Sequence, residues 1–349
     1  MPSMPTMPKP SLKIWMEEPK PHHLGVSLLR FLRQHFDVTM DKDNPDILFF
    51  SRRRFHSNIH YPCVRVFYDA QHSPQSIAEV SDWELGYVRH DGAAARQVYM
   101  PNWLFLDCAR LIAPPEDASR LMREKTGFCA FIHHQPHPVR NQFYTLFASH
   151  RRVDALGDMF RNRPRPRGLE PHTDSARLEQ LAPIYRKYKF VVSFESNAMP
   201  GYVTEKLVCP LLARSVPIYW GDPRVLHLIN PACFINAHDF DTPQALVEHV
   251  MKVDADDALY RRYLAAPVFL DGKLPLCVRH THLRDRILAL AEESRAPHFL
   301  PQAQRSIFLR EHLSRLERFF LQDLLPSRIV KSGQAWSDPH RALQSTTTS

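Results

Sequence analysis

The segment from residue 188 to residue 225 constrains the fold more than any other part of the chain. Residues 189–194 form an apolar and aromatic run typical of a buried strand, and residues 216–220 form a second one. Residues 203–213, between these runs, have the length and composition of a helix with Thr204 near its start. A strand, a helix and a strand in this order predict a parallel β–α–β unit.

The same alternation is present along the rest of the chain. The pattern predicts strands at residues 12–15, 46–50, 64–68 and 128–132, with helices at 25–35 and 139–150. Repeated strand–helix units in both halves predict an α/β protein with two domains and mainly parallel sheets, for which 349 residues are sufficient.

The composition suggests where these domains divide. Residues 114–118 read as a linker, so we expect a first α/β domain at residues 1–115 and a second at 116–270. Residues 1–11, which alternate Met and Pro, are expected to be a disordered lead-in. Residues 271–349 are expected to form a C-terminal helical region with a basic amphipathic helix at 302–325 and a disordered tail.

Glycine and cysteine usage excludes several kinds of site. The chain has ten glycines and no G-x-G, so it has neither a dinucleotide fingerprint nor a P-loop, and it would bind phosphate with cationic side chains and a helix N-terminus. The six cysteines include no CxxC pair, which argues against a zinc site or a disulfide framework and fits a reducing cytosol. The first residues lack the apolar core of a signal peptide.

The charge balance does not identify a ligand. The chain has 45 basic and 37 acidic residues, a formal charge of +8, which suits an anionic ligand, an anionic membrane surface or nucleic acid. The helix at 302–325 either lies on an anionic membrane or packs across the two domains with its arginines in water, as surface helices generally do.

Residues 202–206, Y-V-T-E-K, open the helix of the first β–α–β unit. A lysine in the first turn opposes the helix dipole, and an anion bound at that end would offset the mismatch. Glu205 is placed to accept hydrogen bonds from ribose hydroxyls. A capped surface helix would explain the same residues without a ligand.

These residues resemble the signature of the α1,3/α1,4-fucosyltransferase family, F-E-N-[ST]-x(4)-Y-[IV]-T-E-K, without a gap from Phe194 to Lys206. Residues 216–221 resemble the family's I-P-[IV]-Y-W-G. Residues 128–131, 140–144 and 152–157 resemble earlier family blocks in the same order. The resemblance covers roughly residues 12 to 240.

The resemblance implies a GT-B fold, with two Rossmann-like domains facing a cleft. The first domain would hold the acceptor and the second GDP-fucose. The implied activity is that of an inverting glycosyltransferase, a fucosyltransferase that moves L-fucose from GDP-fucose to a hydroxyl of an acceptor glycan. The acceptor position would be α1,3 on an N-acetylglucosamine or glucose unit, in protein or lipopolysaccharide glycosylation.

By the same resemblance, Arg140 is a catalytic cation at the diphosphate, where its guanidinium can bind phosphate bidentately. Lys206 makes a second phosphate contact, and Glu205 is a catalytic residue that also holds the nucleotide or the sugar. The expected donor-binding residues are Arg140, Glu195, Ser196, Asn197, Tyr202, Glu205 and Lys206.

Two departures from the family affect these expectations. Ser196 stands where the family has asparagine, with Asn197 one place later, so another GDP-sugar is an alternative donor. His72 stands where the family has the glutamate of E-S-P, and we expect it to be the general base, with Asp69 or Glu84 as alternatives. The other interpretation of His72 is that it only lines the acceptor cleft.

The remaining polar clusters predict no metal and no tightly bound cofactor. His133, His134 and His137 form a histidine-rich loop for which metal binding is an alternative, but the prolines beside them favour a surface turn. Residues 254–257 match D-x-D but follow a helix rather than a strand, so we expect an exposed turn. Residues 161–167, R-N-R-P-R-P-R, are expected to be a solvated loop.

Two further functions compete with transfer. A pseudo-transferase would bind GDP without turnover, and a basic membrane- or nucleic-acid-binding protein would explain the charge. The chain carries no zinc-finger or aromatic RNA-binding pattern, so we expect no nucleic-acid partner. The expected partners are a GDP-sugar and an acceptor glycan, and the expected location is the cytoplasm, with peripheral contact at the inner membrane face through the C-terminal basic helix.

Overall fold

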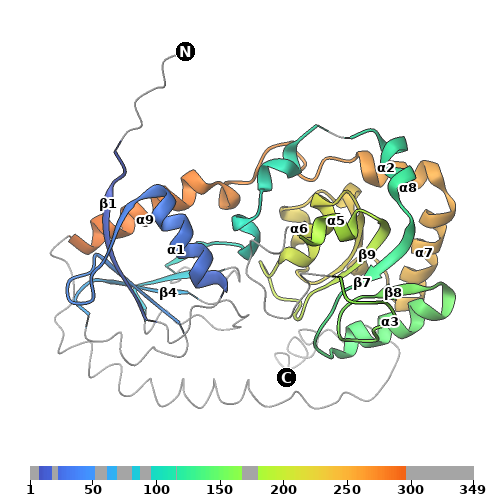
Figure 1. Cartoon of the computed structure of the whole chain (residues 1–349), viewed down its shortest axis with the longest axis horizontal. Helices are drawn as coiled ribbons and strands as arrows, with labels where there is room; N and C mark the ends of the chain where they lie inside the picture. Colours follow the sequence, from blue (N-terminus) through green and yellow to red (C-terminus); the bar gives the residue numbers. More distant parts are fainter. Residues whose placement is uncertain are drawn as a thin grey trace, which may run out of the picture. The chain divides into compact units, whose positions relative to one another are not determined.

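The computed structural model describes residues 8–17, 23–51, 61–68, 81–86, 96–114, 116–166 and 180–295 (Figure 1). The expected base His72, its alternative Asp69 and the helix predicted at 302–325 lie outside these residues. The chain divides into two compact units: residues up to Met100 with the segment from Leu276, and residues Pro101–Pro275. The sequence had suggested divisions near residues 115 and 270.

The first unit is built on a parallel sheet with strand order β2-β1-β3-β4-β5-β6. Its strands are β1 (Ser11–Glu17), β2 (Asp37–Met40), β3 (Ile47–Phe50), β4 (Val64–Tyr68), β5 (Trp83–Gly86) and β6 (Gln97–Tyr99). Helix α1 (His23–His35) follows β1, and α9 (His280–Arg295) returns to contact β3 and β4. The Trp83 indole donates to Glu293 at 3.0 Å, so polar contacts also hold α9 on this sheet.

The second unit is built on a parallel sheet with strand order β11-β10-β9-β7-β8. Its strands are β7 (Gly127–Phe131), β8 (Val153–Ala155), β9 (Tyr188–Phe194), β10 (Val216–Trp220) and β11 (Ile235–Asn236). Its helices are α2 (Ala118–Glu124), α3 (Pro138–His150), α5 (Leu181–Tyr185), α6 (Glu205–Leu212), α7 (Pro243–Ala255) and α8 (Asp257–Ala265). Short 3-10 turns at Asn102–Phe105 and Cys108–Ile112 contact α6, which is why residues before 115 belong to this unit.

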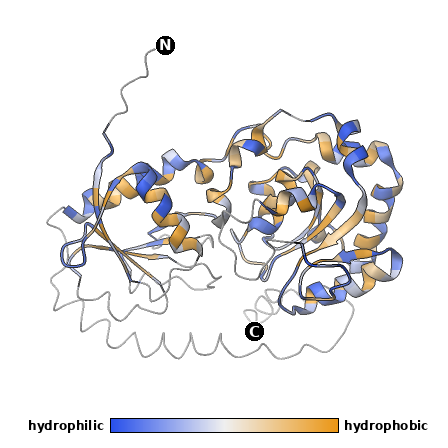
Figure 2. Ribbon diagram, viewed as in Figure 1, coloured by the Kyte–Doolittle hydropathy of each residue, from blue (hydrophilic) through white to orange (hydrophobic). Residues whose placement is uncertain are grey.

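The predicted β–α–β unit is confirmed by β9, α6 and β10. The two strands pair in parallel, with Trp220 opposite Phe194. Thr204 is the N-cap of α6, and its hydroxyl accepts from the Lys206 amide. Figure 2 shows hydrophobic residues concentrated on the strands and on the helix faces that pack against them, in both units.

One expectation about this unit is wrong for a single residue. Residues 255–257 of the D-x-D segment are exposed where α7 passes into α8, but the Asp254 side chain is only 6% exposed and its carboxylate lies 2.7 Å from the Lys189 ammonium. Asp256 caps α8 by accepting from the Leu259 amide at 2.9 Å. Within the ranges given above, no helix has the length and apolarity that a membrane span requires.

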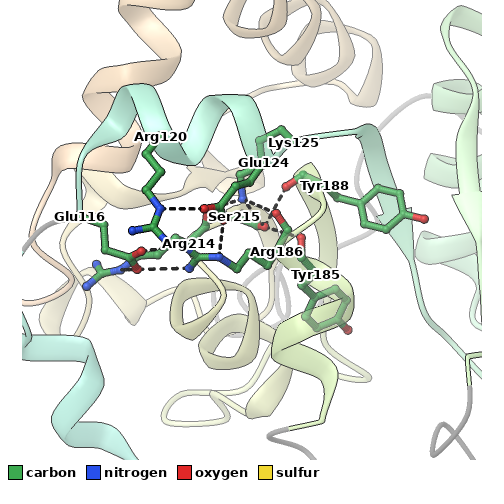
Figure 3. Close-up of polar contacts among 9 residues, drawn as sticks. All are labelled: Glu116, Arg120, Glu124, Lys125, Tyr185, Arg186, Tyr188, Arg214 and Ser215. Carbon is green, nitrogen blue, oxygen red and sulfur yellow. Dashed lines mark hydrogen bonds and ion pairs between the residues drawn. The ribbon is translucent and has the colours of Figure 1, made fainter.

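One ammonium group joins three chain segments at the amino ends of β7, β9 and β10 (Figure 3). Lys125 follows α2, and its Nζ donates to the carbonyl oxygens of Arg186 at 2.9 Å and Arg214 at 2.6 Å, and to Ser215 Oγ at 3.2 Å. Those acceptors lie in the turns that lead into β9 and β10. The amino edge of the sheet is therefore fixed by a partly buried polar cluster.

Acidic side chains of the α2 region complete the cluster (Figure 3). The Arg186 guanidinium donates to Glu124 and Glu116, at 2.6 Å each, and hydrogen bonding to Arg186 lowers the pKa of both carboxyl groups. Arg120 adds a contact of 3.1 Å to Glu124. These bonds hold α2 against the turn between α5 and β9.

Burial, reinforced by the nearby Arg186 charge, lowers the pKa of Lys125 to about 7, whereas an unfolded lysine titrates near 10.4. Between those values the unfolded chain binds a proton that the folded protein does not, so the stability contributed by Lys125 should rise as the pH rises from about 7 to about 10. At pH 9, Lys125→Met should lower the free energy of unfolding by about 1–3 kcal/mol, because two buried carbonyls lose a donor. The wild-type advantage should shrink toward pH 7.

Denaturant unfolding across this pH range measures the effect. Lys187→Met removes an exposed lysine immediately before β9 and is the matched control, with no expected change. A stability difference for Lys125→Met that stays constant with pH would contradict the lowered pKa.

Candidate functional site

The carboxyl ends of β7 and β9 and the first turns of α3 and α6 bring the expected donor-binding residues together. Arg140, in the first turn of α3, donates from Nε to the Phe194 carbonyl at the end of β9, at 3.0 Å. Lys206, in the first turn of α6, lies 3.4 Å from Glu195. This edge of a parallel sheet is where α/β proteins bind ligands.

The Arg140 guanidinium is a buried cation with an incomplete set of hydrogen bonds among the described residues. The residue is 5% exposed, and its NH2 nitrogen is buried without a hydrogen-bond partner in the described part of the chain. Burial lowers its pKa, against the opposing effects of Glu195, Tyr202 and Glu205. Because a guanidinium stays charged even so, a charged donor is left without an acceptor, which native interiors rarely tolerate without a reason.

Glu195 lies below the surface of this site. It is completely buried and accepts from the Thr204 amide at 2.8 Å and from the Thr204 hydroxyl at 2.7 and 2.8 Å. Burial raises the pKa of Glu195, while Lys206 and the Thr204 hydrogen bonds oppose that rise. The geometry gives Glu195 the role of anchoring the start of α6, and direct contact with a donor stays a prediction.

Lys206 is paired inside the site. Its Nζ lies 3.2 Å from Glu205 and 3.4 Å from Glu195. Burial by itself would lower the pKa of Lys206, but the Glu205 and Glu195 carboxylates raise it overall. These carboxylates already offset the mismatch between the lysine and the helix dipole, so the mismatch does not by itself require a bound anion.

Ser196 and Tyr202 form a hydroxyl pair within the loop between β9 and α6. Ser196 Oγ lies 2.9 Å from Tyr202 Oη. Tyr202 is 6% exposed, and its burial raises its pKa, so the phenol remains protonated. Asn197 is half-buried in the same loop.

His133 was assigned to a surface turn, and that interpretation is wrong. It lies two residues after the end of β7, is 3% exposed, and its Nε2 lies 3.3 Å from the Val192 carbonyl. Burial, followed by the charges of Arg140 and Lys206, lowers the pKa of His133 well below its usual range. A neutral imidazole thus belongs to the same charged cluster, and only its position after a buried strand could have indicated this.

The other two histidines of that loop have separate partners. His134 pairs with Asp158 at 2.7 Å. His137 stands at the N-cap position of α3 without a capping hydrogen bond from its side chain, and its ring lies 5.9 Å from that of Trp220. Among the side chains that the structure describes, no group of three or more His, Cys, Asp or Glu residues could hold a metal ion. Glu84, the alternative base, is 5% exposed on β5 in the first unit.

Comparison with known proteins identifies the second unit. Residues 122–266 match the model described as "Glycosyltransferase family 10 (fucosyltransferase) C-term". This part of the chain is similar to the family 10 glycosyltransferase domain. Arg140, Glu195, Ser196, Asn197, Tyr202, Glu205 and Lys206 all lie within this match, so the resemblance seen in the motifs is confirmed.

Named relatives agree with this assignment. An alpha-(1,3)-fucosyltransferase of Helicobacter pylori is 32% identical over 155 residues, 43% of this chain and 30% of that protein. Alpha-(1,3)-fucosyltransferase B of Drosophila melanogaster is 33% identical over 128 residues, 36% of this chain and 28% of that protein. The matched part thus spans less than a third of the length of these relatives.

A solved structure shows the fold. The crystal structure of an alpha1,3-fucosyltransferase with GDP-fucose has a TM-score of 0.63 at 21% identity, over 86% of this chain and 95% of that one. Together with the two parallel α/β sheets, this confirms the GT-B fold class.

Gly221 packs closely against the Tyr219 and Glu195 side chains. A Cβ at this position would lie 2.4 Å from Tyr219 Oη and 2.6 Å from Glu195 Cγ. Gly221→Ala should therefore displace Glu195 and weaken its hold on Thr204, lowering the Tm by several degrees.

Thermal unfolding measures this effect. Gly86→Ala, also at the end of a parallel strand, is the control because a Cβ there meets nothing within 4 Å in the described structure. Equal Tm values for the two variants would show that Glu195 is not confined by Gly221.

Proposed function

We propose that this chain is an inverting fucosyltransferase that moves L-fucose from GDP-fucose to a hydroxyl of an acceptor glycan. The observation that supports it most is the buried Arg140 guanidinium, whose NH2 group has no partner in the described chain and lies in the first turn of α3. A diphosphate at the start of this helix would supply the missing acceptor and interact favourably with the helix dipole.

The proposed step places charge where the site has cations. The acceptor oxygen attacks C1 of fucose as the bond from C1 to the β-phosphate oxygen breaks, so GDP leaves with the bonding electrons. Arg140 and Lys206 stabilise the negative charge that grows on the phosphate, an effect that is usually the largest part of such catalysis. Glu205 and Tyr202 are proposed to hold the ribose or the sugar.

His72 is the proposed general base that takes the acceptor proton on the opposite face of the sugar. Support comes from the sequence alone, because His72 replaces the glutamate of the family's E-S-P. His72→Ala should lose most of kcat while GDP affinity is unchanged, as measured by initial rates and calorimetry. Near-normal turnover would show that His72 is not the general base and would leave Glu84 and Asp69 as the candidates.

The acceptor and the donor sugar complete the proposed reaction. We infer an α1,3 linkage to N-acetylglucosamine or glucose from the family resemblance. The hydroxyl pair of Ser196 and Tyr202, at 2.9 Å, favours a second candidate, transfer from another GDP-sugar, since serine lacks the amide of the family asparagine. A cytoplasmic location and membrane contact through residues 302–325 stay predictions.

A panel of nucleotide sugars tests the donor. The full chain with a glycan acceptor should release GDP from GDP-fucose and leave UDP-sugars intact. Consumption of UDP-sugars with GDP-sugars ignored would contradict the proposal, and GDP binding without any transfer would indicate a pseudo-transferase.

Arg140→Met extends the same assay. The substitution should weaken GDP binding at least about tenfold, because a charge-assisted contact is lost. Its Tm should change little, since an unpartnered buried donor is removed along with the bond to Phe194. Arg123→Met, an exposed arginine of α2, is the control and should bind GDP like the wild type.

A further inference from the structure

A second buried carboxylate holds the loop between β9 and α6. Asp222 follows β10 in the turn Gly221-Asp222-Pro223 and is 4% exposed. Its Oδ2 accepts from the Gly201 amide at 2.8 Å, and its Oδ1 accepts from the Arg224 amide at 2.8 Å. The first bond joins positions 21 residues apart, so it connects the end of β10 to the donor loop.

The loop is held from two sides by neighbouring strands. Glu195, beyond β9, binds Thr204, and Asp222, beyond β10, binds Gly201. The two strands are joined at the same edge, where the Glu195 amide donates to the Trp220 carbonyl at 2.8 Å. Tyr202 lies between the two held positions.

The hydrogen bond to Asp222 holds Gly201 at a position where the backbone conformation is costly. Its φ of +83° lies in the left-handed region, which glycine enters without a steric penalty but at a high entropic cost. The turn that carries Asp222 is itself fixed, because the Asp222 amide donates to Tyr219 Oη at 3.0 Å and His238 Nε2 lies 2.8 Å from the Gly221 carbonyl. A rigid turn therefore determines the conformation of the more adaptable loop.

We propose that Asp222 is a positioning residue for the donor: it sets the conformation of residues 199–204, and through them the location of the Tyr202 hydroxyl. The inference rests on the proposed function for the identity of the ligand. Pre-ordering this loop lowers the entropy that donor binding must otherwise remove. A carboxylate suits the position because it offers an acceptor oxygen to each of two amides, whereas an asparagine offers one.

A purely local role for Asp222 is the alternative. Its contact with the Arg224 amide, two residues on, is an ordinary Asx-turn bond that stabilises the turn alone. Asp222→Ser separates the two roles, because a serine hydroxyl can retain the local turn bond but is too short to reach Gly201. Asp222→Asn preserves shape and removes one acceptor.

Steady-state kinetics of the full chain test the inference. For Asp222→Ser and Asp222→Asn, the KM for GDP-fucose should rise about tenfold, the effect expected for losing one hydrogen bond to a charged group, with kcat changed much less. Asp254→Asn is the matched control, a 6% exposed carboxylate of the same unit that binds Lys189. It should lower the Tm and leave the KM unchanged.

Unaltered KM values in both Asp222 variants, or an equal rise in Asp254→Asn, would overturn the inference. Hydrogen exchange provides a readout that needs no substrate: the Gly201 amide should exchange at least about tenfold faster in Asp222→Ser than in the wild type. Equal exchange rates would show that Asp222 does not hold the Gly201 amide. If the wild type neither binds GDP nor turns over GDP-sugars, the proposed function fails, while the exchange result still decides whether Asp222 holds the loop.

Discussion

The contact between the Glu195 carboxylate and Thr204 determines how the rest of the site is arranged. Glu195 extends β9, and Thr204 is the N-cap of α6, so one buried carboxylate fixes the distance between strand end and helix start. Lys206 follows Thr204 by two residues, and Arg140 is tied to Phe194, the residue before Glu195. Both cations therefore take their positions from the end of the same strand.

The positive charges of Arg140 and Lys206 are matched in number by the carboxylates of Glu195 and Glu205, but one hydrogen-bond donor of the site has no acceptor among the described residues. Lys206 has two carboxylates within 3.4 Å, whereas Arg140 retains a buried NH2 group without an acceptor in the described structure. Burial makes each of these interactions stronger than it would be in water, and it makes an unmatched donor costly. An anionic ligand would be attracted mainly by Arg140 and the start of α3, with Lys206 free to exchange one of its carboxylate contacts for the ligand.

Local sequence patterns were sufficient for the elements but not for the contacts between them. The strands and the helix at residues 188–225 follow from hydrophobic runs and a capping threonine. Arg140 and Lys206 are identified as phosphate-binding residues through the family resemblance, and the structure places both in helix first turns. The burial of His133 and the pairing of Asp254 with Lys189 depend on residues 59 and 65 positions away. Patterns of short period carry no information about such partners, so the sequence suggested surface turns in both places.

The two edges of the second sheet carry different polar chemistry. At the amino edge, Lys125 and Arg186 are surrounded by carbonyls and carboxylates that accept their hydrogen bonds. At the carboxyl edge, Arg140 is more deeply buried, at 5% exposed, and its NH2 nitrogen has no acceptor in the described structure. The Arg186 guanidinium at the amino edge, 28% exposed, is bonded to two carboxylates, so the two edges treat their guanidinium groups differently. The described part of the chain supplies no acceptor for this Arg140 nitrogen, and the diphosphate of the proposed donor would have the charge and the oxygens to be that acceptor.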